Sequence, residues 1–356
     1  MAYTNINDPS AYFQTVLWTG DGLDNKQITN DGNSDLQPDW VWLKDRTQAE
    51  SPAIFDSTRG ATVRLQPNST GTESTETATL KSFTTDGFTV GTSGSVNNGS
   101  NPDEYVAWQW KANGGTTASN TDGTITSTVQ ANTDAGFSIV TWAGTASTAT
   151  IGHGLGVAPK VVIVRARNKG VPTSWLVFHK DGSTSDDDYL ILQTTSAKGT
   201  QVGLWNNQYP SSTVFGVAND FWVNSASTNY IAYCFAEKQG YSKFGKYIGN
   251  GNTNGAYVYT GFKPAFVITK AASSASSWSM YDHKRLGYNP IDVWLRANGS
   301  DAESTSAIPG ADIDLLSNGF KLRNSNGTIN GSGITYIYMA FAENPFVAGG
   351  IPTTAR

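Results

Sequence analysis

The sequence is short of the residues that mark several large classes of protein. Its 356 residues include a single cysteine, Cys234, which excludes an internal disulfide framework. No stretch approaches the roughly 18 apolar residues of a membrane span, and the first residues lack the basic and apolar segments of a secretion signal. Charged residues make up only 15% of the chain. We therefore expect a protein that is made in a cytoplasm and stays soluble, with Cys234 buried and inert.

Motifs of catalytic and metal sites are also missing. The three histidines, His153, His179 and His283, are far apart, and no His-Glu-x-x-His, paired-cysteine, Gly-x-Ser-x-Gly or phosphate-loop pattern occurs. The net charge of −5 argues against electrostatic binding of nucleic acid or of an anionic membrane. We expect no enzyme activity, no catalytic residues, no metal and no cofactor. A calcium ion that braces the acidic loops over 21–31 or 186–188 stays an alternative, although no ligand spacing defines such a site.

Glycine and aromatic residues are plentiful. The 37 glycines suit many tight turns, and the aromatic content of 12% supplies the apolar surface that a folded core needs. The apolar runs are short, rich in β-branched and aromatic residues, and bounded by Gly, Asn, Ser and Pro, as strands are. No segment has helical periodicity over more than a turn or two. The composition predicts an all-β protein.

Two anchor runs occur three times along the chain. Each copy has a proline followed by an apolar run and, later, a tyrosine-rich run. The proline runs are Pro38–Lys44, Pro159–Arg165 and Pro264–Lys270, and the tyrosine runs are Tyr105–Lys111, Tyr230–Glu237 and Tyr336–Glu343. The proline and the tyrosine are 67, 71 and 72 residues apart. This spacing predicts three tandem antiparallel β-sandwich domains of the jelly-roll or lectin type.

The repeat also predicts the boundaries. We expect a first sandwich with an N-terminal attachment segment over 1–112, a Gly/Thr/Asn-rich linker and edge strand over 113–135, a second sandwich over 136–239, a third over 240–347 and a C-terminal tail over 348–356. Copies one and three share a Gly-Phe turn at Gly87 and Gly319, which we align with Asn219–Val223 in copy two. Because Gly114 and Gly115 resemble a flexible joint, we expect copy one to be independent and copies two and three to form a fixed pair.

The sharpest polar pattern is an Asp-x-x-Arg after the second strand of copies one and three. It comprises Asp56 with Arg59 and Asp282 with Arg285, whereas copy two has His179 at this place. One interpretation is a ligand-binding pair, since the arginine fork holds carboxylates or sugar hydroxyls. The simpler interpretation, which we prefer, is a local ion pair that orders the turn.

Two further features have competing explanations. The pairs Asp312/Asp314 and Asp186/Asp188 could serve glycoside hydrolysis, but a run of aspartates in a polar loop is more often simply solvated. Trp40 with Trp42, and Trp108 with Trp110, each face one side of a strand. We expect both tryptophan pairs in the core; an exposed pair would suit stacking on a sugar ring or docking on another protein. These pairs do not change the expectation of a non-enzymatic protein.

With the repeats laid out, the chain resembles repeat-built virion structural and tail-fibre-like proteins of tailed phages of marine bacteria and cyanobacteria. The segments that carry the resemblance are Gly152–Gly156, Gly249–Gly251, Tyr259–Phe266, Asp312–Lys321 and Tyr336–Glu343. The resemblance implies a virion structural role and provides no catalytic residues to assign.

From this resemblance we expect a non-enzymatic protein on the exterior of a virion, most simply a tail-fibre or receptor-binding component. Capsid decoration and glycan depolymerisation are the alternatives. The expected partners are other virion proteins of tail or capsid, a host cell-surface glycan and further copies of the chain, with no nucleic acid and no membrane. We expect the segment Met1–Phe13 to attach the chain to the particle through Tyr3, Ile6, Tyr12 and Phe13.

Overall fold

Antiparallel β-sheets dominate the computed structural model, which describes residues 3–100, 103–170, 173–304, 312–348 and 351–352. The helices in these ranges are two single turns, the 3-10 helix η1 (Pro9–Ala11) and α1 (Gly94–Asn97). Neither has the length or apolarity needed to cross a membrane. The prediction of an all-β chain is confirmed.

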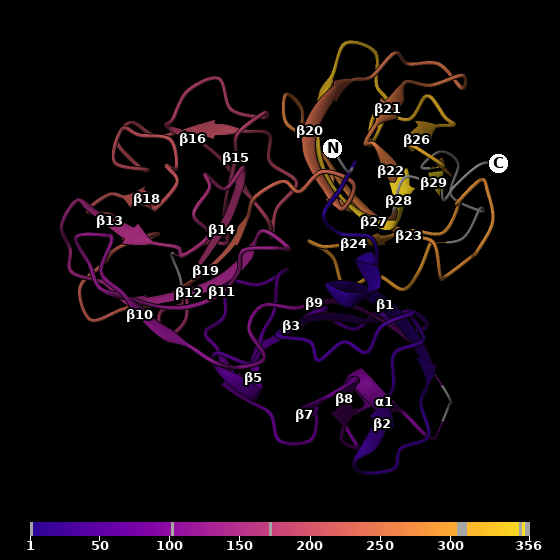
Figure 1. Ribbon diagram of the computed structural model, residues 1–356, viewed down its shortest axis with the longest axis horizontal. Helices are drawn as coiled ribbons and strands as arrows, with labels where there is room; N and C mark the ends of the chain where they lie inside the picture. The colour runs from indigo at the N-terminus through magenta and orange to yellow at the C-terminus, as the bar shows by residue number, and fades with distance from the viewer. Residues whose placement is uncertain (1–2, 101–102, 171–172, 305–311, 349–350, 353–356) are drawn as a thin grey trace.

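The strands gather into three lobes around a common centre (Figure 1). Lobe 1 contains β1 (Phe13–Thr19), β2 (Lys26–Ile28), β3 (Trp40–Asp45), β4 (Ala53–Asp56), β5 (Gly60–Leu65), β6 (Ser74–Thr75), β7 (Leu80–Thr84), β8 (Gly87–Val90) and β9 (Glu104–Trp110). Its large sheet has the order β1-β9-β3-β4-β5-β6, and its small sheet has the order β2-β8-β7.

Lobe 2 follows with ten strands. They are β10 (Ala118–Asn120), β11 (Ser127–Asn132), β12 (Phe137–Ala143), β13 (Ala149–Gly152), β14 (Val161–Ala166), β15 (Leu176–His179), β16 (Asp188–Ile191), β17 (Gly199–Thr200), β18 (Val214–Val217) and β19 (Asn229–Phe235). The large sheet has the order β10-β11-β12-β19-β14-β15-β16-β17, and β13 pairs with β18. The segment expected to be a linker therefore holds β10 and β11, which extend this sheet.

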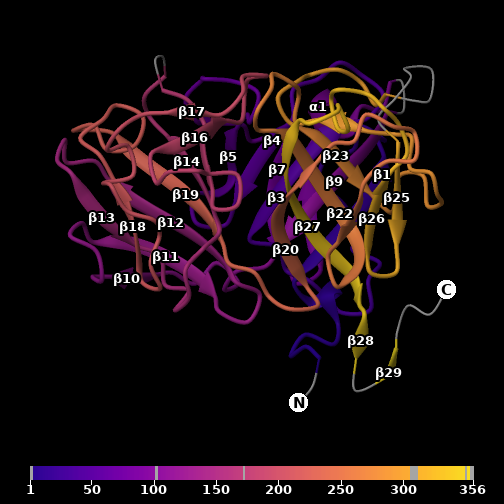
Figure 2. The same ribbon diagram turned by 90° about the horizontal axis from the view of Figure 1, so that it is seen from above.

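Lobe 3 and a C-terminal hairpin complete the chain. The strands of lobe 3 are β20 (Ser242–Ile248), β21 (Tyr257–Tyr259), β22 (Phe262–Ala271), β23 (Ser279–Asp282), β24 (Leu295–Arg296), β25 (Ile313–Leu316), β26 (Gly319–Leu322) and β27 (Thr335–Pro345). Its sheets have the orders β20-β27-β22-β23-β24 and β21-β26-β25, while β28 (Val347–Ala348) pairs with β29 (Ile351–Pro352). The first described residues of the chain and the strands β28 and β29 lie at one end of the molecule (Figure 2).

The three large sheets share one strand order and one register. The order β1-β9-β3-β4-β5 in lobe 1 matches β12-β19-β14-β15-β16 and β20-β27-β22-β23-β24. The matching cross-strand rows are Trp110, Trp40 and Asp56 in lobe 1, Phe235, Val161 and His179 in lobe 2, and Phe341, Phe266 and Asp282 in lobe 3. The anchor prolines stand two residues before the middle residue of each row. In lobe 3, Pro264 lies inside β22 at a register shift, where a missing N–H is tolerated.

One expected alignment in lobe 2 is wrong. Phe88 and Phe320 pair with Ile28 and Val258 in the small sheets, and the residue at this place in lobe 2 is Phe215 of β18, which pairs with Ile151. The segment 219–223 forms a turn instead. In lobes 1 and 3 the Gly-Phe dipeptide turns a hairpin into β8 or β26, whereas β18 pairs only with β13 and needs no such turn.

The central strands of each large sheet are buried on both faces. One face packs on the small sheet of its own lobe, and the other joins a central aromatic core shared by all three lobes. All six residues of β3 and of β14 are consequently buried, an uninterrupted pattern that strands show when both faces are covered. Trp40, Trp42, Trp108 and Trp110 lie in the central core, as expected for core residues.

Aromatic rings join the lobes directly in this core. Trp40 stacks on Tyr233 with ring centroids 4.6 Å apart, Trp110 meets Phe341 edge-on at 5.4 Å, and Phe235 meets Phe341 at 5.8 Å. A cavity of only about 20 Å³ remains among these side chains. Lobe 1 therefore contributes to the same core as lobes 2 and 3, and the expectation that it is the independent unit is wrong.

The glycine joint between lobes 1 and 2 is held in place. The buried carboxylate of Asp39 accepts hydrogen bonds from the backbone N–H groups of Ala112, Gly114 and Gly115 at 2.7 to 2.9 Å. Gln130 of β11 accepts two more through its side-chain oxygen, one of them from Gly115 at 2.9 Å. Positive φ at both glycines follows the shape of this loop rather than marking a hinge.

The N-terminal segment is folded against lobe 3 and the core. Tyr3 donates a hydrogen bond to the carbonyl of Gly261 at 2.6 Å, and Thr4 donates to that of Gln239 at 2.6 Å. Ile6 is buried in the central core. The residues that we expected to anchor the chain to a particle are thus used within the chain itself.

Candidate functional site: the braces between the lobes

Both Asp-x-x-Arg motifs fold back on themselves at the end of a strand. The backbone N–H and Nε of Arg59 donate to the two carboxylate oxygens of Asp56 at 2.8 and 2.6 Å. Arg285 makes the same two bonds to Asp282 at 2.9 and 2.6 Å. All four side chains are 0% exposed. They offer no surface to an external ligand, so their burial favours the bracing interpretation over the ligand-binding one.

Each of these aspartates also receives a hydrogen bond from a neighbouring lobe. Asp56 of lobe 1 accepts from the hydroxyl of Tyr233 in lobe 2 at 2.8 Å. Asp282 of lobe 3 accepts from the indole Nε1 of Trp108 in lobe 1 at 3.0 Å. Tyr233 and Trp108 occupy matching positions of β19 and β9, so the two contacts are the same contact made at two boundaries.

The third boundary explains why lobe 2 lacks the motif. The residue of β27 that matches Tyr233 and Trp108 is Met339, which has no N–H or O–H on its side chain. A buried aspartate facing it would lack a donor. His179 stands there instead, and its Nε2 lies 3.2 Å from the backbone carbonyl of Tyr338. The absence of Asp-x-x-Arg from copy two is therefore matched to its neighbour.

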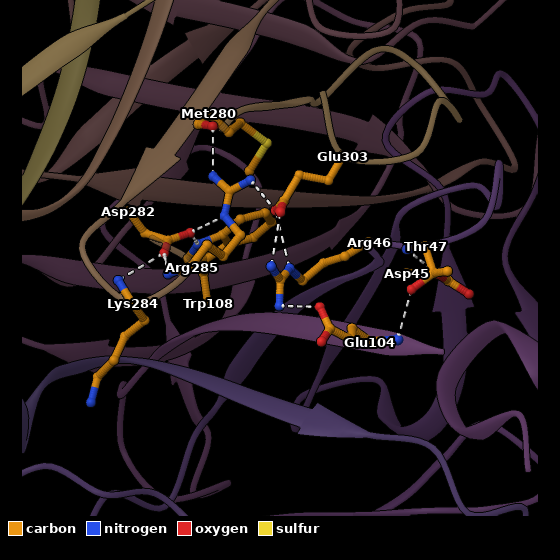
Figure 3. A network of polar contacts seen from close by, with 10 residues as sticks. All are labelled: Asp45, Arg46, Thr47, Glu104, Trp108, Met280, Asp282, Lys284, Arg285 and Glu303. Carbon is orange, nitrogen blue, oxygen red and sulfur yellow. Dashed lines mark hydrogen bonds and ion pairs between the residues drawn. The ribbon is translucent and has the colours of Figure 1, made fainter. Parts of the chain in front are cut away.

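Glutamates extend the two motifs into the adjoining lobe, and Figure 3 shows the one at the boundary of lobes 3 and 1. Glu303 accepts a hydrogen bond from Arg285 at 2.9 Å. It also accepts two from Arg46, from Nε at 3.0 Å and from Nη2 at 2.8 Å. Glu73 of lobe 1 accepts the same pair of hydrogen bonds from Arg167 of lobe 2, at 2.9 and 3.0 Å. Two-point pairing of this kind adds geometric specificity to the attraction between charges.

Three equivalent backbone hydrogen bonds run alongside these ion pairs. The N–H of Glu73 donates to the carbonyl of Arg167 at 2.8 Å, and that of Glu303 donates to Arg46 at 2.7 Å. At the remaining boundary the N–H of Lys198 donates to Ala272 at 2.8 Å. Lobe 1 thus reaches lobe 2, lobe 2 reaches lobe 3 and lobe 3 reaches lobe 1. Head-to-tail contacts that return to their starting point form a closed ring.

A buried cation stands at one matching strand position in each lobe. Lys44, Arg165 and Lys270 are at most 1% exposed. Arg165 donates to the carbonyls of Thr70 and Gly71 in lobe 1, and Lys270 donates to that of Thr195 in lobe 2. Burial lowers the pKa of both lysines to about 8 and that of Arg165 to about 10.

The electrostatics of the braces follow from burial and pairing. Burial acts to raise the pKa of Asp282, but the adjoining Arg285 outweighs it and holds that pKa below its ordinary value. Burial alone would lower the pKa of Arg59, and Asp56 raises it instead. Burial lowers the pKa of His179 to about 4. At neutral pH Asp282 and Arg59 are therefore charged, and His179 is neutral.

The comparisons with known proteins bear on the ring as a whole. A family model described as "Domain of unknown function (DUF7483)" matches residues 8–345. The chain belongs to this family. The match begins in front of β1 and ends at the last residue of β27, so the family's common unit contains all three lobes. No curated protein and no solved structure matches the chain.

The aspartate pairs and the cysteine noted in the sequence analysis lie apart from one another or are buried. Asp188 is 1% exposed and accepts from Lys198 at 2.6 Å within lobe 2, while Asp314 pairs with Arg323 at 3.2 Å. Among the described residues, no three His, Cys, Asp or Glu side chains are placed to hold a metal ion. Cys234 is buried, and burial raises the pKa of its thiol. None of these groups joins the braces.

A second threefold set escaped sequence reasoning. Each anchor tyrosine, Tyr105, Tyr230 and Tyr336, donates its hydroxyl to a loop carbonyl at 2.6 to 3.0 Å. A buried asparagine precedes each tyrosine and ties the same end of the lobe together; the three are Asn97, Asn224 and Asn330. The constant spacing of six residues from Asn224 to Tyr230 and from Asn330 to Tyr336 was the available signal.

Proposed function

We propose that this chain is a non-enzymatic structural protein on the exterior of a bacteriophage particle, acting as a tail-fibre or receptor-binding component. The observation that carries the proposal is the closed ring of three lobes around one aromatic core. Its prominent buried polar clusters serve the boundaries between lobes, a use that suits a rigid structural part. The resemblance of the anchor runs to virion proteins supplies the biological setting.

The finer fold belongs to the same proposal. We take the three lobes to be copies of one sandwich domain of the jelly-roll or lectin type. The shared order of five strands and the matching register of the large sheets support this. Fibre and spike parts of phages are commonly built from three chains. The ring would provide a comparable threefold body within a single chain, an argument from fold-level analogy.

The proposed partners follow from the arrangement of the N-terminal segment and the last strands. The first described residues and the strands β28 and β29 share one end of the molecule (Figure 2). We place other virion proteins of the tail or capsid at that end and a host cell-surface glycan at the opposite, loop-bearing end. Self-association remains part of the proposal, through outer surfaces, because the head-to-tail faces of the lobes are occupied within the chain.

Quantitative mass spectrometry of purified phage particles that encode this chain tests the proposal. We expect the protein in the particles at a few copies each, as for a fibre. A copy number that follows the capsid shell would replace the fibre with the capsid-decoration alternative. Absence from the particles, with the protein present in the lysate, would overturn the virion assignment. Degradation of host polysaccharide by the purified protein would overturn the non-enzymatic one.

A further inference from the structure

The boundary between lobes 3 and 1 contains an open cavity of about 360 Å³. For brevity, each boundary is called a seam and is named by its two lobes. The 3/1 cavity lies between Phe13 and Thr15 of β1 on one side and Ala265, Lys284 and Glu343 of lobe 3 on the other. Comparison with the other two seams shows what is missing from it.

At the 2/3 seam a lysine side chain fills this place. The ammonium group of Lys160 lies 3.1 Å from Glu237, 3.1 Å from Asp181 and 3.4 Å from the carbonyl of Phe244. In the shared register Lys160 corresponds to Ala265 of the 3/1 seam. Its three partners correspond to three residues that line the 3/1 cavity, namely Glu343, Lys284 and Thr15. The 3/1 cavity therefore includes the position that the Lys160 side chain takes at the 2/3 seam.

At the 1/2 seam polypeptide fills the same place. Asp39 corresponds to Ala265, and it holds the backbone amides of Gly114 and Gly115. The side-chain amide of Gln130 lies beside them and contacts Ser57 at 3.0 Å. The linker that leaves lobe 1 therefore covers this position. The segment that leaves lobe 3 continues from β27 into β28 and β29, and none of its described residues beyond Asn344 lines the 3/1 cavity.

The floor of the 3/1 cavity also has an unused strand edge. The carbonyl of Tyr12 accepts a hydrogen bond from the N–H of Lys111, next to β9. In an antiparallel pair of strands, every second residue forms its backbone hydrogen bonds with the partner strand. The N–H and C=O of Thr15, three residues after Tyr12, therefore point away from β9. They make no hydrogen bond across the seam to a described residue. The matching groups are satisfied elsewhere: Phe244 N–H donates to Glu237 at 2.8 Å, and Ile139 pairs with Gln130 in β11.

We propose that the 3/1 cavity binds a short, uncharged segment of a partner polypeptide, in the place that Gly114, Gly115 and Gln130 fill at the 1/2 seam. The charges at the cavity are already balanced, since Lys284 pairs with Asp31 at 2.7 Å and Lys263 with Glu343 at 2.8 Å. A neutral segment with both amide donors and carbonyl acceptors suits such a site. The site is a property of the fold, and only the source of the segment, a second component of the particle, rests on the proposed function.

The test uses the full chain with its alanine methyl groups labelled for NMR, since Ala265 and Ala342 line the cavity. The probe is an acetylated and amidated peptide with the sequence of residues 112–118, Ala-Asn-Gly-Gly-Thr-Thr-Ala. We expect saturable shifts of these two methyl signals, with a dissociation constant on the order of 1 mM. A peptide with aspartate in place of asparagine should bind several-fold more weakly.

Ala265→Lys restores the side chain present at the 2/3 seam and should abolish the shift at Ala342. Val202→Lys adds the same charge at a residue that is 84% exposed and should leave binding unchanged. If Ala265→Lys fails to fold, Asn33→Trp on the exposed rim serves as the blocking variant. The proposal is overturned if the peptide causes no shift, if the blocking variant still binds it, or if methyl N-acetylglucosaminide gives the same shifts. None of these outcomes depends on whether the protein is found in phage particles.

Discussion

Tyr233→Phe is the most direct test of the braces. It removes one hydroxyl and keeps the ring, which stacks on Trp40 at 4.6 Å in the central core. The hydroxyl donates to the buried carboxylate of Asp56 at 2.8 Å, so the substitution deletes a single hydrogen bond between lobes 1 and 2. Arg59 remains as the partner of Asp56. The perturbation is therefore specific to one brace at one seam.

The expected cost follows from the charge and burial of the acceptor. A hydrogen bond to a charged group contributes about 1.5–3 kcal/mol, and a buried acceptor that loses its donor cannot recover it from water. We expect Tyr233→Phe to lower the free energy of unfolding by about 2 kcal/mol. Tyr241→Phe is the matched control, because the hydroxyl of Tyr241 is buried and has no hydrogen-bond partner among the described residues. Its loss should cost less than about 0.5 kcal/mol.

Urea denaturation followed by tryptophan fluorescence measures both variants. A double-mutant cycle with Asp56→Asn isolates the contact itself, and we expect a coupling energy of at least about 0.5 kcal/mol, as for residues that share one network. Equal stability losses for Tyr233→Phe and Tyr241→Phe would refute the argument, since the bond to Asp56 would then contribute nothing. A coupling energy near zero would refute it independently.

Three further predictions concern the ring. Far-UV circular dichroism and tryptophan fluorescence should report one coincident unfolding transition, because the lobes share a core, and separate transitions would contradict that. Deleting residues 1–11 should lower the free energy of unfolding in urea by roughly 3 kcal/mol, through loss of buried Ile6 and the hydrogen bonds of Tyr3 and Thr4. Unchanged stability would contradict a stabilising role for this segment. The pKa of His179 is lowered by burial to about 4 from an ordinary 6.5, so the unfolded chain takes up a proton first as pH falls. Stability should therefore drop by roughly 3 kcal/mol between pH 6.5 and 4, and His179→Gln, measured in parallel, should show a smaller drop.

The sequence was sufficient to predict strands and repeated anchors, because both are local patterns. Proline, glycine and the alternation of apolar residues act over a few positions, and Pro159 and Tyr230 mark the same strands in lobe 2 as Pro264 and Tyr336 do in lobe 3. The alignment of Phe215 failed because lobe 2 lacks the hairpin turn that marks this strand in the other lobes.

The central core was harder to predict, since its contacts join distant parts of the chain. Tyr233 and Asp56 are separated by 177 positions, and Trp108 and Asp282 by 174. Nothing near Asp56 in the sequence distinguishes a buried brace from an exposed ligand site. The uninterrupted apolar run Val161–Val164 did contain a usable signal, because a strand with one solvated face would alternate.

Differences among the lobes follow the seams between them. Where β19 and β9 present a hydroxyl or an indole N–H, the facing lobe has a buried aspartate; where β27 presents Met339, it has His179. Arg46 and Arg167 each form an ion pair with a glutamate of the neighbouring lobe. The matching residue in lobe 3 is Ala272, and the residue that faces it is Lys198, which forms its ion pair with Asp188 of its own lobe. Three identical chains would have to make three identical seams. Joining the lobes in one chain lifts that requirement, so each seam can be specified separately and each lobe has one correct neighbour on either side.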